Sequence, residues 1–144
     1  MKARNPLFLL AALLLAACSA ILPGPDGPVS SGDPSFQPRP EDAALQRGRA
    51  YINSADLLTM ESYPLQFSLR VQGDLPTPCH QLRVDIQPSD AQGVIVLDAY
   101  SVIDPERVCA EVLQPFDVNL PLGSFPPGEY EIRLNGEKVA EFNT

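Results

Sequence analysis

The residues of this chain best suited to chemistry are one histidine, His80, and three cysteines, Cys18, Cys79 and Cys109. His80 adjoins Cys79, but the spacing of Cys and His matches no zinc-binding pattern. A nucleophilic serine or cysteine would need that same histidine as its base, and the chain has no Gly-x-Ser-x-Gly elbow and no glycine-rich phosphate loop. We therefore interpret His80 as a partly exposed strand residue.

Carboxylate pairs are the other candidates for acid–base chemistry. Asp104 with Glu106, and Glu129 with Glu131, lie two residues apart. Residues at this spacing share one face of a strand, and an acidic chain produces such pairs on its solvated face. A calcium loop with alternating oxygen ligands is absent from the sequence. The sequence therefore predicts no enzyme, no metal site and no cofactor.

The N-terminal residues predict an export signal. Residues 2–4 are basic and residues 7–15 are apolar, too short a run to span a membrane. The run ends Leu15-Ala16-Ala17-Cys18, which resembles the bacterial lipobox. This resemblance implies a signal peptide at residues 1–17, acylation of Cys18, and stable anchoring in a lipid bilayer by two or three acyl chains. The alternative is an ordinary secretory peptide that is cleaved nearby, for example after Ala20.

Ser19 follows the expected lipidated cysteine. In the enterobacterial sorting pattern an aspartate at this place retains a lipoprotein at the inner membrane, so Ser19 favours the outer one. We expect an exported protein, held on the outer side of the cytoplasmic membrane or at the outer membrane.

Cys79 and Cys109 remain as a pair once Cys18 is acylated, and export places them where disulfides persist. A bridge between them would close a loop of about 31 residues, worth roughly 3–4 kcal/mol in the loop-closure model. Two buried free thiols are the competing interpretation. A redox pair is disfavoured because reactive cysteines usually lie close together as Cys-x-x-Cys.

The charge of the mature chain argues against some classes of binding partner. Removal of Lys2 and Arg4 with the signal peptide leaves 8 basic residues against 18 acidic ones, a net charge of −10. A chain this acidic, without a basic run, is a poor ligand for nucleic acid or for anionic lipid.

Residues 18–50 are expected to form a linker. Prolines and glycines dominate residues 23–40, which predicts a disordered tether, with a proline-rich ligand around Pro25 and Pro28 as the alternative. Residues 41–50 have the composition of a short helix and could equally be the end of the linker or a lead-in to the first strand.

Alternating apolar and polar residues predict strands in the rest of the chain. The regular ones lie at 65–72, 81–87, 93–103, 116–122, 129–134 and 138–142, after a less regular one at 51–63 that Asn53-Ser54 interrupts. Pro121 indicates an edge or a bulge, and Asn135-Gly136 predicts a hairpin. About seven short strands and no long helix predict an antiparallel immunoglobulin-like sandwich at residues 51–144, with a small barrel as the alternative.

Three segments resemble a group of small bacterial secreted or lipid-anchored β-sandwich domains. The first contains Leu75, Pro76 and Cys79. The second contains Cys109, Pro115 and Phe116, and the third is PPGEYEIRLNGE with Tyr130 and Asn135-Gly136. The resemblance covers residues 65–142 and implies a fold and a disulfide, with no established activity and no binding residues.

Three functions fit these expectations. The first is a non-catalytic binding module that meets an envelope protein, a peptide or a glycan through its loops. The second is a protease inhibitor that presents rigid loops at residues 74–78 and 123–128. The third is a passive structural lipoprotein. A glycan site normally displays exposed aromatic residues, and Phe125 is the one clear candidate on a turn.

Overall fold

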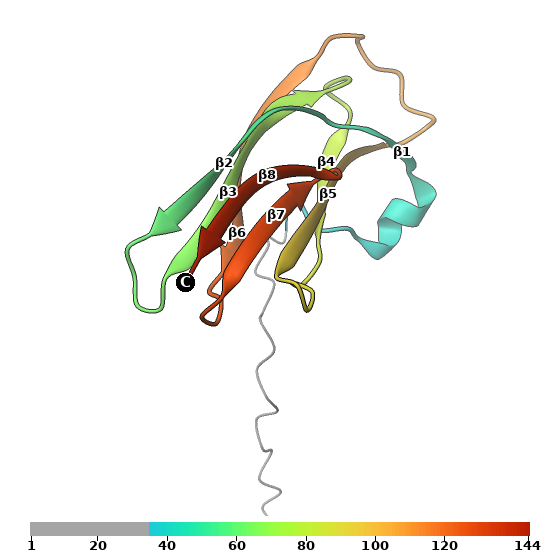
Figure 1. Cartoon of the computed structure of the whole chain (residues 1–144). Helices are drawn as coiled ribbons and strands as arrows, with labels where there is room; N and C mark the ends of the chain where they lie inside the picture. Colours follow the sequence, from blue (N-terminus) through green and yellow to red (C-terminus); the bar gives the residue numbers. More distant parts are fainter. Residues whose placement is uncertain (1–34) are drawn as a thin grey trace, which may run out of the picture.

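The computed structural model describes residues 35–144, which form two β-sheets packed face to face (Figure 1). The expected signal peptide, Cys18 and the linker up to residue 34 lie outside the described residues. The elements are η1 (Pro40–Ala44), a 3₁₀ helix, and the strands β1 (Gln46–Arg49), β2 (Tyr51–Met60), β3 (Gln66–Leu75), β4 (Gln81–Ile86), β5 (Val94–Ile103), β6 (Gln114–Gly123), β7 (Glu129–Leu134) and β8 (Glu137–Asn143). No helix in this part of the chain is long and apolar enough to cross a membrane.

The first sheet consists of β1, β4, β5, β7 and β8, and the second of β2, β3 and β6. Residues 100–102 of β5 pair with both β1 and β4, and Leu97 pairs with both β4 and β7. Therefore β1 and β7 follow one another along one edge of β5, and β4 occupies the other edge. The long strand β5 is the centre of the first sheet, and β3 is the centre of the second.

The predicted all-β sandwich is confirmed, with two differences. The described residues contain eight strands rather than about seven, because the short β1 precedes the first expected strand. The pair β5–β7 is parallel, whereas every pair was expected to be antiparallel. The reason is that β6, which lies between them in the sequence, runs in the other sheet, so β7 re-enters the first sheet in the direction of β5.

The core lies between the two sheets and is built from alternate residues of each strand. Phe67, Leu69 and Val71 of β3 point towards Ile95 and Leu97 of β5, and all five are at most 2 % exposed. Burying one such side chain stabilises the fold by about 1.5–3 kcal/mol. The alternation of apolar and polar residues in the sequence thus indicates which face of each sheet packs against the other sheet.

Local signals in the sequence match local backbone features. The ladder between β2 and β3 shifts register between Ile52 and Ser54, so Asn53 is an irregularity within β2 and does not end the strand. Asn135 and Gly136, with φ of 52° and 89°, form the predicted tight turn between β7 and β8. Pro121 lies in β6, which is an edge strand as expected.

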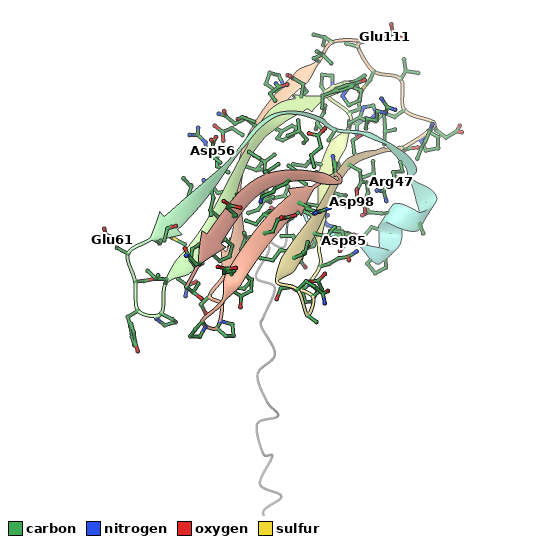
Figure 2. All side chains as sticks on the ribbon, in the orientation of Figure 1. Arg47, Asp56, Glu61, Asp85, Asp98 and Glu111 are labelled. Atoms are coloured by element: carbon green, nitrogen blue, oxygen red, sulfur yellow. A yellow bond between two sulfur atoms is a disulfide. The ribbon has the colours of Figure 1, made fainter. Side chains whose placement is uncertain are left out.

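Residues 35–49, which were assigned to the expected linker at 18–50, pack on the sandwich. The Val84 amide of β4 donates to the Phe36 carbonyl at 2.7 Å, and β1 pairs with the end of β5. Arg47 of β1 lies over the Tyr100 ring at 3.6 Å and pairs with Asp98 (Figure 2). The folded unit therefore begins before the expected boundary at residue 51.

A buried ion pair joins η1 to the outer face of β4. The Arg83 guanidinium donates to both oxygens of Asp42, at 2.7 and 2.9 Å, and the two side chains are only 3 % and 10 % exposed. Arg83 also donates to the Leu82 carbonyl and to Gln81. Because a buried guanidinium without a partner is costly, this pair holds residues 40–44 against the sheet.

Replacing Asp42 with asparagine should lower the free energy of unfolding by about 3 kcal/mol near neutral pH, the lower end for breaking a buried pair, since Gln81 and Leu82 still bind Arg83. The hydrogen bond from Arg83 lowers the pKa of Asp42. The ionised Asp42 therefore contributes fully to the free energy of unfolding above the ordinary aspartate pKa of about 3.9. This contribution is lost as the pH falls through the lowered pKa of Asp42. Urea denaturation from about pH 7 downwards should show the two proteins converging below about pH 4.

The matched control is Asp85→Asn, because Asp85 is an exposed carboxylate on β4, the strand that contains Arg83. Its effect should stay within about 0.5 kcal/mol. An Asp42→Asn protein as stable at neutral pH as the Asp85→Asn protein would contradict the role given to this pair.

Candidate functional site

Cys79 and Cys109 form the disulfide expected from the sequence, with their Cα atoms 6.2 Å apart. Cys79 lies between β3 and β4, and Cys109 lies between β5 and β6. Both of these connections pass from one sheet to the other at the same end of the sandwich. The bridge therefore ties the two sheets together across that end, which we call the disulfide end.

The connection between β5 and β6 is an irregular loop at residues 104–113. Turns fold it locally: the Asp104 side chain accepts from the Glu106 amide, and the Arg107 amide donates to the Asp104 carbonyl. In Figure 1 the loop extends beyond the strands at one end of the molecule, and Figure 2 places Glu111 at the extremity of that end. The bridge at Cys109 holds the middle of the loop in place.

Loop 104–113 exposes large apolar side chains. Val108 is 96 % exposed, and Val112 and Leu113 are each 56 % exposed. A single exposed apolar residue is ordinary, but three on one crosslinked loop are apolar area that the fold itself leaves largely exposed. Since the disulfide limits the freedom of the loop, ordering it on a partner costs less conformational entropy.

The charged residues of this loop are mainly acidic. Asp104, Glu106 and Glu111 are exposed, and Arg107 is the one base among residues 104–113. The pair Asp104 and Glu106 was expected to be solvated, and both side chains are exposed. The described residues contain no group of three His, Cys, Asp or Glu side chains that could hold a metal ion. The loop thus offers apolar contacts within an acidic surround.

His80 is part of the turn that supports the disulfide. Its Nδ1 lies 2.8 Å from Thr77 Oγ1, and its ring lies close to Gly48 of β1. A Cβ atom at Gly48 would come within 3.5 Å of His80 Nε2 and 2.9 Å of Ser101 Oγ. Gly48 therefore permits the ring to pack against β1, which is a structural use for the single histidine.

Glu129 and Glu131, the second carboxylate pair, differ in their surroundings. Glu129 is exposed, whereas Glu131 is paired with Arg133 at 2.6 Å and with Lys138 at 3.3 Å. The hydrogen bond from Arg133 and then that from Lys138 lower the pKa of Glu131. Glu131 is thus held as a carboxylate in a surface ion-pair cluster rather than poised to exchange a proton.

The turn at residues 123–128 was expected to present a rigid loop, and its Phe125 was expected to be an exposed aromatic residue. Residues 126–128 are exposed, but the expectation for Phe125 is wrong, because its side chain is half-buried against the core. Phe125 packs against Tyr130 and Phe142, with ring centroids 4.9 and 5.3 Å away, and it contacts Phe67 of the core. The Pro126 carbonyl accepts from the Tyr130 hydroxyl at 3.1 Å. The phenyl ring packs on these aromatic side chains and so covers the end of the core opposite the disulfide.

The turn at residues 74–78 lies at the disulfide end but is largely built into the fold. Asp74 and Leu75 belong to β3, Leu75 is buried, and Thr77 Oγ1 binds both His80 and the Cys79 amide. The most exposed segment at this end is instead loop 104–113, which was not singled out as a binding loop. The sequence feature that could have indicated this loop is residues 108–113, which are mainly apolar but lie outside any predicted strand.

The model of one protein family, described as the ORF11 beta-sandwich domain, matches residues 69–144, more than half of the chain. The matched part begins within β3 and contains both bridged cysteines and loop 104–113. Comparison with the curated proteins and with the solved structures finds no match.

Replacing Cys79 with alanine should lower the free energy of unfolding by about 2–5 kcal/mol, because the unfolded chain regains the freedom of a closed loop. Urea denaturation measures this loss. The double variant Cys79→Ala/Cys109→Ala should cost about as much as either single variant, since all three remove the same bond. Two thiols that titrate in the native, air-exposed protein would show that the bridge is not formed.

Proposed function

Since the chain belongs to the ORF11 beta-sandwich domain family, whose description gives a fold and no activity, we propose that it is a lipid-anchored, non-catalytic binding module of the bacterial cell envelope. The observation that carries this proposal is loop 104–113, with its exposed apolar residues held in place by the Cys79–Cys109 bridge. The partner we propose is another envelope protein that offers an apolar hollow with a basic rim.

The chemistry of the loop supports a protein partner. Val108, Val112 and Leu113 supply apolar area, and the burial of apolar area drives most protein association. The acidic surround steers the loop towards basic surfaces and away from nucleic acid and anionic lipid. A glycan is disfavoured because Phe125, the aromatic candidate for stacking on a sugar, is half-buried and packs against Phe67 and Tyr130.

The sequence alone supports the lipid anchor. A basic start, an apolar run at residues 7–15 and Leu15-Ala16-Ala17-Cys18 are the features that a lipoprotein signal requires. In this proposal Cys18 carries the acyl chains, the residues after it bridge the distance to the sandwich, and Ser19 favours the outer membrane. The disulfide agrees with this location, because disulfides persist outside the cytoplasm.

Protease inhibition is the second candidate function, and one observation favours it. Arg107 and Val108 are exposed immediately before the bridged Cys109, which gives a projecting segment supported by a crosslink. This segment differs from the two turns from which the sequence predicted inhibition. A passive structural role has no specific observation in its favour.

Acylation of Cys18 should be measurable in cells supplied with radiolabelled palmitate. The wild-type chain should carry the label and sediment with membranes, whereas Cys18→Ala should carry none, because the thiol is the acceptor. A wild-type chain recovered unlabelled from the soluble fraction would refute the anchor while leaving the role of the loop untouched.

The double substitution Val108→Asp/Leu113→Asp tests the loop. It should weaken partner binding at least about tenfold, because it removes the apolar contacts. It should change the free energy of unfolding by less than about 1 kcal/mol, because both side chains are exposed. The measurement is crosslinking in membranes of cells that produce the full chain, followed by mass spectrometry of the captured proteins.

Leu65→Asp is the matched control, because Leu65 is 42 % exposed but lies in the hairpin between β2 and β3, away from the disulfide end. A partner captured equally by both variant proteins would overturn the role given to loop 104–113. If the captured partner is a protease whose activity the wild-type chain blocks and the loop variant does not, the inhibitor function holds instead.

A further inference from the structure

Among the described residues, five strands pair with a single neighbouring strand, namely β1, β2, β4, β6 and β8, and four of them have a feature that hinders pairing with another chain. The strand β1 is only 4 residues long, and a very short edge strand is a poor template. The edge of β4 is partly covered, because its Val84 amide donates to the Phe36 carbonyl. The edge strand β6 contains Pro115 and Pro121, and proline cannot donate to a new ladder. On β8 the charged residues include Lys138, a residue type typical of protected edges.

The fifth outer strand, β2, lies along one margin of the molecule (Figure 1). Its residues 54–60, which we call the edge segment, pair with β3 in an unbroken register from Ser54 opposite Gln72 to Met60 opposite Gln66. The edge segment contains no proline and no glycine, and Asp56 is its single charge. An edge of this kind is a ready template for another strand.

The outer face of the edge segment also exposes apolar side chains. Leu58 and Met60 lie on this face, on either side of Thr59, and are 40 % and 46 % exposed. Neither residue belongs to the core or to the side chains packed against it. A strand added beside β2 on the same sheet would cover part of both.

We propose that the occupant of this edge is a second copy of the chain, paired antiparallel through the edge segment with Leu57 of both copies on the two-fold axis. This register uses the whole segment. On the outer face it places Asp56 opposite Leu58 of the partner, and Ser54 opposite Met60 of the partner. No like charges meet, and the second sheets of the two copies become one continuous sheet.

The neighbouring registers are worse. Centring the axis on Asp56 places the two Asp56 carboxylates opposite each other, which is unfavourable across strands. Centring it on Leu58 shortens the paired run by two residues on each strand. A shift by a single residue would set the core face of one copy against the outer face of the other.

The antiparallel arrangement also brings together the two ends of β2. Tyr63, in the hairpin that follows β2, is fully exposed, and Tyr51, at the start of β2, is 47 % exposed. In the pair, the hairpin end of one copy lies beside the start of β2 in the other. Exposed aromatic residues therefore flank the paired strands on both sides, as expected for a contact between two copies.

Sedimentation of the whole protein, extracted from membranes in a mild detergent, tests the proposal. The wild-type chain should show a concentration-dependent dimer. Leu58→Glu should raise the dimer dissociation constant roughly tenfold, because two Glu–Asp56 contacts between like charges replace two Leu58–Asp56 contacts across the axis. The charge-swapped double variant Asp56→Lys/Leu58→Glu should restore the dimer, since each new glutamate then faces a lysine.

Leu65→Glu is the matched control, because Leu65 is 42 % exposed in the same hairpin but lies outside the edge segment. It should leave the dimer intact, and circular dichroism should show all variants folded. A wild-type chain that stays monomeric at about 100 µM, well above the dissociation constant of a stable dimer, would overturn the proposal. So would a Leu65→Glu effect equal to that of Leu58→Glu, or a failure of the double variant to recover.

Discussion

Burial of two apolar sheet faces against each other is the interaction on which the rest of this structure depends. The described residues contain no helix that could cover either sheet, so each sheet must serve as the cover of the other. The central strands β3 and β5 supply the most deeply buried side chains, among them Leu69 and Leu97, which are both fully buried. Every other feature is arranged around this layer, including the inward turn of Phe125 and the outward position of the loops.

The two ends of the sandwich are closed in different ways, and this difference produces the candidate site. At one end an aromatic cluster of Phe67, Phe125, Tyr130 and Phe142 fills the space between the sheets. At the other end a covalent bond joins the connections that pass between the sheets. Because the bond holds loop 104–113 without burying it, the apolar residues of the loop remain available to a partner.

The segment before β2 shows how a sandwich with open edges is protected. Residues 35–49 run along the first sheet, where Phe36 covers the edge of β4 and Asp42 binds the buried Arg83. The proposed linker therefore attaches to the sandwich at a segment that is itself fixed by a buried ion pair. Residues 35–144 provide no such cover at β2 in the second sheet, which is why the pairing of two copies is proposed there.

The amino-acid sequence by itself determined those features that depend on neighbouring residues. Alternation of apolar and polar residues placed the strands, and Asn135-Gly136 placed a turn that needs positive φ at both positions. Counting cysteines predicted the bridge between Cys79 and Cys109, because an acylated Cys18 leaves a single pairing. The lipid anchor remains a prediction from the same kind of local pattern.

Only the tertiary structure decided the features that depend on residues distant in the sequence. Residues 40–49 are too short and too polar to reveal a strand, and β1 exists because β5 offers an edge on which it can pair. The parallel pairing of β5 with β7 follows from the placement of β6 in the other sheet. Phe125 and Val108 are both apolar residues in connections between strands, yet one is half-buried against the core and the other is 96 % exposed. The physical reason is that a side chain in a connection is buried only if the fold places it near the space between the two sheets. The local sequence does not determine that position.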